Sequence, residues 1–280
     1  MILLIVIVTA LISAIGTHID KHLVNKGISR KDYFYYMCLS MIPFSIILMI
    51  IEIITNNFKF EFGLIPALLL ILAMFIRYKK QHTIVGCLTY LKPYETAAYM
   101  SLGIIIAFII DGILGIKQFN IYTAISIILT LMGIFILADA KLKIKSLQKD
   151  LIIKMLCDVA LGYVTHYILK YLSNASFIFL LNLFLTILFS KGYTVKYHKE
   201  NKKILKWVFI QQIFGVLATY LGNYLSASSV LLSSFTKPIS IVLTIMIAFV
   251  LKDKAKKPKI ADVLAIVLVA CGIGMLNLTM

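Results

Sequence analysis

Long apolar runs separated by short polar gaps dominate the chain. Ten such runs lie at about 2–20, 33–54, 63–80, 83–111, 118–138, 150–171, 175–192, 205–225, 228–251 and 260–278. Each approaches the ~20 apolar residues that a helix needs to cross a bilayer. The gaps leave no room for a soluble domain. The pattern therefore predicts an all-α, polytopic membrane bundle of ten transmembrane helices.

Composition supports a membrane protein. The 280 residues are 61% hydrophobic, whereas soluble domains are roughly 45–50% apolar. The first run begins at Ile2 with no basic segment before it, so we interpret it as a first span rather than a cleaved signal peptide. The four cysteines are scattered without C-x-x-C spacing, which indicates small buried side chains and no disulfide or metal framework. We expect no cofactor.

Basic residues alternate between the gaps. Of the 28 Lys and Arg residues, 23 lie in every second gap, namely 21–32, 77–82, 139–154, 190–206 and 251–259. Short loops rich in Lys and Arg stay in the cytoplasm, so with ten spans both termini face outward. A merged or divided span would reverse this orientation. Only two of these residues are arginine, which nucleic-acid sites favour, so we expect no nucleic-acid partner despite the net charge of +16.

The two halves of the chain share three pairs of matching short sequences. The matched pairs are Thr17-His18 with Thr165-His166, Lys92-Pro93 with Lys237-Pro238, and Met132-Gly133-Ile134 with Cys271-Gly272-Ile273. Chance matching in an Ile- and Leu-rich chain is the alternative to a repeat. The order of the matches favours two five-helix repeats, 1–140 and 141–280, in one membrane domain. An odd number of helices inverts the second copy, as in secondary transporters.

With these motifs the chain resembles the drug/metabolite transporter superfamily, in its EamA-like branch of ten-helix transporters. The resemblance covers the whole chain. It rests on helical runs that end at Pro93 and Pro238, on Lys21 and Lys170 late in the first helix of each half, and on a last helix that contains glycine. It implies transport by alternating access, with a substrate site between the halves.

Lys92 and Lys237 are the strongest candidates for a substrate site. Each lies inside an apolar run, about nine residues from either end, and each precedes a proline. An ammonium at that depth costs roughly 2.5–3.5 kcal/mol, so it must face protein or a water-filled cavity. The proline removes a helix hydrogen bond and kinks the helix. The pair predicts a cationic site for an anionic substrate; a purely structural role, with each lysine snorkelling or paired with a carboxylate, is the alternative.

Glu95 follows Lys92 by one helical turn, and two interpretations stay open. The two side chains form an ion pair within one helix, or Glu95 couples transport to protons through a carboxylate that is desolvated as the pathway closes. Glu95 also suits the amine of a zwitterionic substrate. Tyr90 and Tyr94 flank the Lys-Pro pair and are further substrate-binding candidates, as is Gln211, whose simpler interpretation is an interhelical hydrogen bond.

His18 and His166 occupy equivalent places in the two halves. Histidine titrates in the physiological range, so both are candidates for proton coupling, although a lone membrane histidine more often serves packing or hydrogen bonding. Asp158 lies two turns before His166 and is a candidate partner for it.

Together these features predict a secondary active transporter in the cell membrane that moves a small polar organic metabolite, anionic or zwitterionic. We expect it to be no enzyme, and to act as a monomer or homodimer in the lipid bilayer with protons or a counter-substrate as coupling partner. The alternative is a flippase for a lipid headgroup, or a membrane enzyme acting on an anionic lipid. No Gly-rich phosphate loop or Ser/His/Asp arrangement appears in the sequence.

Overall fold

The computed structural model describes residues 2–25, 30–61, 63–90, 98–116, 120–137, 149–190, 202–250 and 260–277. Across these ranges the regular structure is helical, apart from one isolated bridge between Phe60 and Leu172. The predicted all-α fold is confirmed at this level.

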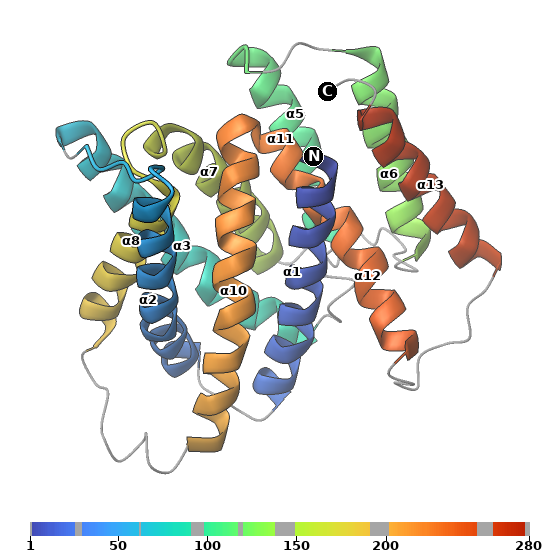
Figure 1. Ribbon diagram of the computed structural model, residues 1–280. Coiled ribbons are helices and arrows are strands. Elements are labelled where there is room, and N and C mark those ends of the chain that lie inside the picture. The colour runs from blue at the N-terminus through green and yellow to red at the C-terminus, as the bar shows by residue number, and fades with distance from the viewer. Residues whose placement is uncertain are drawn as a thin grey trace.

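Each of the ten predicted apolar runs contains a helix. The helices are α1 (Ile2–Asn25), α2 (Arg30–Ile54), α3 (Leu64–Tyr90), α5 (Gly103–Ile113), α6 (Ile121–Leu137), α7 (Lys149–Ile168), α8 (Asn174–Phe189), α10 (Lys202–Ser228), α11 (Val230–Ser234), α12 (Thr236–Val250) and α13 (Ile260–Asn277). Figure 1 shows them packed side by side in one bundle.

The predicted loop at 77–82 is wrong, because α3 continues through it as one helix of 27 residues. Arg77 and Gln81 are buried there, at 7% and 9% exposure. Both side chains find partners on α2, since Arg77 Nη2 lies 3.5 Å from the Met41 sulfur and the Gln81 amide contacts the Met37 sulfur. Polar side chains that face other helices do not require the helix to leave the membrane.

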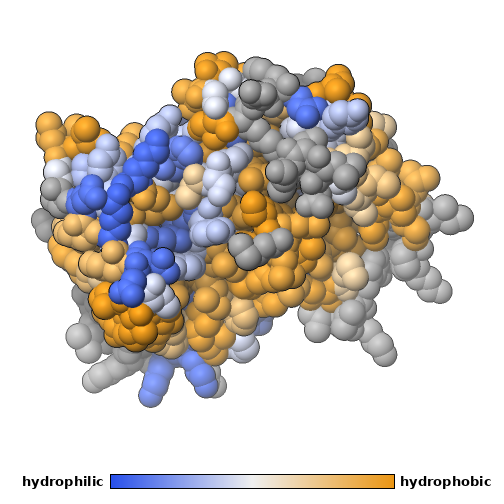
Figure 2. Space-filling view, turned by 45° about the horizontal axis from the view of Figure 1, so that its top comes forward, coloured by the Kyte–Doolittle hydropathy of each residue, from blue (hydrophilic) through white to orange (hydrophobic). Residues whose placement is uncertain are grey.

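Apolar side chains cover much of the outer surface. Five helical stretches of the described chain are long and apolar enough to cross a membrane: Ile2–Asp20, Asp32–Ile54, Lys149–Ile168, Ile204–Ser228 and Val230–Ile247. Leu64 and Ile113 are 77% and 74% exposed, and Figure 2 shows broad apolar areas on either side of a band of hydrophilic residues. An apolar exterior of this extent is typical of a protein surrounded by lipid.

Helices α1 and α7 run in opposite directions. The segment that follows α7 lies beside the segment that follows α2, where Phe60 pairs with Leu172 and Ser173 N donates to Lys59 O at 2.7 Å. The C-terminal ends of α2 and α7 therefore share one end of the bundle. Because α2 runs in the direction opposite to α1, the C-terminal end of α1 lies at the other end (Figure 1).

The largest apolar core joins helices from both halves of the sequence. Phe34 of α2, Leu70 of α3, Leu161 of α7 and Leu181 of α8 belong to one buried cluster. Burial of side chains of this size contributes about 1.5–3 kcal/mol each in water, and within a membrane close packing takes over that role. The cluster fixes α3 against α7, and so determines which side chains those two helices bring together.

The last membrane-length stretch before α13 is broken at Phe235, between α11 and α12. Pro238 lies in the first turn of α12, where its ring excludes the carbonyl four residues before it from the helix ladder. The predicted interruption beside Lys237 is thus present as a break three residues before the proline. The break lies beside the cavity described next.

Candidate functional site

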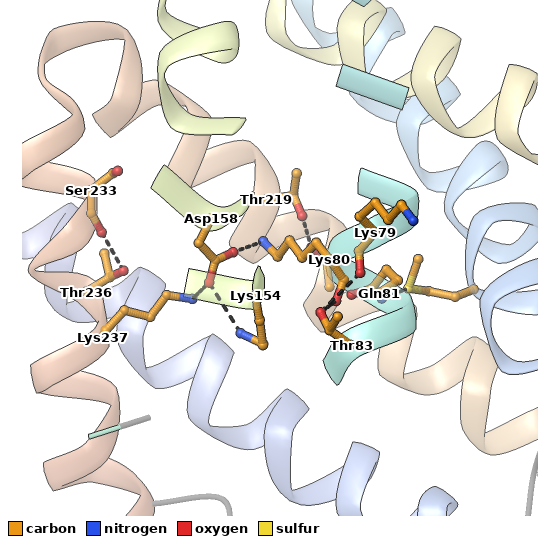
Figure 3. Close-up of polar contacts among 12 residues, drawn as sticks. Lys79, Lys80, Gln81, Thr83, Lys154, Asp158, Thr219, Ser233, Thr236 and Lys237 are labelled. Carbon is orange, nitrogen blue, oxygen red and sulfur yellow. Dashed lines mark hydrogen bonds and ion pairs between the residues drawn. The ribbon is translucent and has the colours of Figure 1, made fainter. Parts of the chain in front are cut away.

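Three lysine side chains converge on the carboxylate of Asp158. Lys154 Nζ lies 3.3 Å from Asp158 Oδ2, Lys237 Nζ lies 3.5 Å from the same oxygen, and Lys80 forms an ion pair with Oδ1. Figure 3 shows the lysines reaching Asp158 from α3, α7 and α12. We call these four residues the Asp158 cluster.

Local helix geometry and helix packing build the cluster. Lys154 and Asp158 are four residues apart on α7, which stacks them on one face of that helix. Lys80 reaches Asp158 because α3 packs along α7. Lys237 lies in the first turn of α12, just after the break at Phe235. Lys154 is buried at 4% exposure and the Asp158 side chain is 12% exposed, so the centre of the cluster lies inside the bundle.

Three members of the Asp158 cluster, Lys80, Asp158 and Lys237, line one wall of a cavity of about 200 Å³, and Lys154 lies behind them. The rest of the lining is rich in short polar side chains that donate or accept hydrogen bonds, including Thr9, Ser13, Thr165, Thr219, Asn223 and Thr236. Gly103, Gly162, Gly222 and Ala218 also line it, and their small size leaves room for a ligand. The cavity is bounded by α1 and α3 from the first half of the chain and by α7, α10 and α12 from the second.

Arg77 also lines this cavity and has few partners. Its side chain is 7% exposed, and its Nε has no hydrogen-bond partner in the described part of the structure. Its Nη2 lies 3.5 Å from the sulfur of Met41, which is a weak acceptor. A buried guanidinium is normally paired with a carboxylate or another strong acceptor. Arg77 therefore leaves unused hydrogen-bonding capacity at the cavity wall.

The sequence candidates near Pro93 cannot be compared with this site. Lys92, Tyr94 and Glu95 lie outside the described residues. Tyr90 is the last residue of α3, and its side chain is not described. The expected pairing of Lys92 with Lys237, or with Glu95, stays a prediction.

Lys237 lines the cavity, as the position before a proline suggested. Its described partner is Asp158, which the sequence had linked to His166 instead. His166 Nδ1 lies 3.1 Å from the backbone oxygen of Ser226, and His18 Nε2 lies 3.2 Å from that of Thr244. Each histidine thus bonds to the backbone of a neighbouring helix beside the cavity lining, which suits the packing interpretation; their role in coupling stays a prediction.

Gln211 lies within α10, buried at 7% exposure. Its Oε1 accepts a hydrogen bond from the adjacent Gln212 side chain, and its amide nitrogen lies close to Gly16 of α1. The hydrogen bond lies within α10, the approach to Gly16 is a packing contact with α1, and Gln211 is absent from the described cavity lining. Its role in substrate binding is untested.

Sequence reasoning missed Arg77, Lys80 and Lys154 as site residues. All three were assigned to cytoplasmic loops because they belong to basic stretches. One signal was available, since Lys154 and Asp158 have the four-residue spacing of a helical ion pair. Within the described ranges, no group of three or more His, Cys, Asp or Glu side chains is arranged to hold a metal ion.

Comparison with known proteins finds a shared fold but no relative in sequence. No protein-family model and no curated protein matches the chain. A protein known from a crystal structure aligns with a TM-score of 0.67 over 99% of this chain and 95% of that one, at 12% identity. At this identity the likeness concerns the fold alone. Fold and cavity define a helical protein with membrane-length apolar helices and a basic internal cavity.

Proposed function

We propose that this protein is a secondary active transporter of the EamA-like, drug/metabolite transporter type. It moves a small anionic organic metabolite across the cell membrane by alternating access. Ten helices span the bilayer, the basic loops face the cytoplasm, and both termini face outward.

The observation that carries the proposal is the excess of positive charge in the cavity. Lys80, Lys154 and Lys237 share one carboxylate, and Arg77 lines the wall together with Lys80 and Lys237. Buried charge without an opposite charge is costly. An anionic ligand supplies the missing charge, and the surrounding hydroxyl and amide groups supply hydrogen bonds to it.

The arrangement of the helices supports two repeats. If α1, α2, α3, α5 and α6 correspond to α7, α8, α10, α12 and α13, the contacts of one half recur in the other. Helix α1 packs on α10 as α7 packs on α3, and α1 packs on α12 as α7 packs on α5. The pairs α2–α8 and α6–α13 relate each helix to its own counterpart. The opposite directions of α1 and α7 suit an inverted repeat.

Such a repeat gives a physical route for transport. The cavity is bounded by helices from both halves, so a rocking motion of one half against the other opens it to one side and then to the other. Only the α3–α7 ion pair, Lys80 with Asp158, joins the two halves within the cluster. The charged site then stays near the centre of the membrane while the cavity opens to one side of the membrane and then to the other.

A thermal-stability screen of the purified protein tests the charge of the substrate. We use malate as a dicarboxylate, glycerol 3-phosphate as a phosphate monoester, alanine as a zwitterion and putrescine as a cation. A ligand that binds the folded protein alone raises its unfolding temperature. We expect stabilisation by malate or glycerol 3-phosphate and none by putrescine. Stabilisation by putrescine alone contradicts an anion site, and stabilisation by alanine alone points to a zwitterionic substrate that also uses Asp158.

A further inference from the structure

Asp158 is the sole acidic residue of the described cavity lining. Both of its oxygens are engaged, because Lys80 binds Oδ1 while Lys154 and Lys237 share Oδ2. Figure 3 shows the carboxylate at the point where the three ammonium groups meet. An anionic ligand that binds these lysines must compete for the position that this carboxylate holds.

The surroundings make this carboxylate necessary when the cavity is empty. The side chains of Lys154 and Asp158 are 6% and 12% exposed, and Arg77 nearby has an unpartnered Nε. Like charges held close together in a poorly hydrated site repel strongly. Without Asp158, the empty cavity holds several cations and no anion among its described lining residues.

We propose that Asp158 is a built-in counter-ion that replaces the substrate's anionic group while the transporter is empty. The inference rests on the proposed transport function and concerns its return step. With the lysines paired to Asp158, the empty cavity closes and reorients without trapping uncompensated charge. When the anion binds, it forms ion pairs with the lysines and displaces the Asp158 carboxylate from them.

The different exposures of the lysines suggest how this exchange proceeds. Lys154 is nearly inaccessible, whereas the side chains of Lys80 and Lys237 are 21% and 38% exposed. Lys154 also sits on the same helix as Asp158, so that pair survives a relative movement of helices. Lys80 and Lys237 reach Asp158 from α3 and α12, and are the two that an incoming anion contacts first.

Two kinds of flux separate this role from an ordinary binding role. Exchange of labelled for unlabelled anion uses only the loaded transporter, whereas net uptake into empty vesicles also needs the empty transporter to return. Removal of the counter-ion therefore blocks net uptake and spares exchange. It also strengthens anion binding, since the anion no longer competes with a carboxylate.

The experiment compares wild type with D158N and D158E in proteoliposomes, using labelled malate and glycerol 3-phosphate. D150N is the matched control, because Asp150 lies on the same helix in its first turn and lines no part of the described cavity. For D158N we expect net uptake to fall by about tenfold or more while exchange stays within about twofold of wild type. D158E, which keeps the charge, and D150N retain both fluxes.

Each other outcome overturns the inference. If D158N keeps wild-type net uptake, the empty transporter needs no counter-ion there. If D158N loses exchange together with net uptake, Asp158 acts in binding or folding instead. If wild type exchanges neither anion, the proposed function fails for these substrates and the counter-ion role falls with it.

Discussion

The carboxylate of Asp111, at the end of α5, accepts a hydrogen bond from the hydroxyl of Ser229 at 2.6 Å. Ser229 is the N-cap residue that precedes α11, and the same carboxylate accepts from Leu231 N at 3.1 Å and from Tyr163 Oη at 2.7 Å. Asp111 thus holds the start of α11 against α5 and α7. These contacts fix the broken segment that leads to Lys237.

A second carboxylate holds the start of α8 in the way that Asp111 holds the start of α11. Glu52 of α2 accepts hydrogen bonds from Ser173 Oγ at 2.5 Å, from Ala175 N and from Tyr220 Oη at 3.0 Å. Each site combines a buried acid, a serine before a helix, a backbone N–H and a tyrosine. Carboxylates favour helix N-termini because of the unpaired N–H groups there.

Asp111→Asn is expected to destabilise the protein. The neutral amide is a weaker acceptor than the carboxylate for the hydrogen bonds from Ser229 Oγ and Leu231 N. The loss is about 1–3 kcal/mol. Thermal unfolding in detergent measures it, with Asp150→Asn as the control for charge loss alone. An unchanged unfolding temperature contradicts the capping role.

Gly272→Ala tests the close packing of α13 on α6. A Cβ at Gly272 meets Thr130 Oγ1 at 2.2 Å and Ser126 O at 2.8 Å, and the second of these is backbone that cannot rotate away. Overpacking of this kind typically costs about 1–3 kcal/mol. Gly274 on the same helix has nothing within 4 Å of its Cβ position, so Gly274→Ala is the matched control. Equal stability of the two variants would refute the packing.

A reporter fused after Met280 tests the orientation. The alternation of basic loops predicts that the C-terminus faces outward. An alkaline phosphatase fusion, active outside the cytoplasm, is expected to be active, and a green fluorescent protein fusion at the same residue is expected to be dark. A fluorescent fusion with inactive phosphatase reverses the proposed topology.

Hydrophobic pattern predicted the helices well, because a membrane-length apolar run has few alternatives to a helix. The pattern was wrong for α3. The basic stretch around Lys80 suggests a loop in the sequence, but in the structure it lies within the helix and its side chains face other helices. Lys237 was found because it stands alone in an apolar run. The convergence of Lys80 and Lys237 on Asp158 depends on how α3 and α12 pack against α7, and sequence spacing alone does not contain that information.

Uptake of labelled malate or glycerol 3-phosphate by proteoliposomes tests the central claim, that the lysines of the Asp158 cluster bind an anionic substrate. Lys80→Ala and Lys237→Ala each remove one described ligand of that site. Lys79→Ala is the matched control for the first, because Lys79 lies over the Phe75 ring, 5.8 Å from its centre, and Figure 3 shows it apart from Asp158. Lys206→Ala, an exposed position on α10, is the control for the second.

Loss of one charged contact costs about 1.5–3 kcal/mol, so each site variant is expected to take up the anion at least about tenfold more slowly. The two control variants are expected to match wild type. Wild-type uptake in both Lys80→Ala and Lys237→Ala, from protein that inserts and folds normally, would contradict the account.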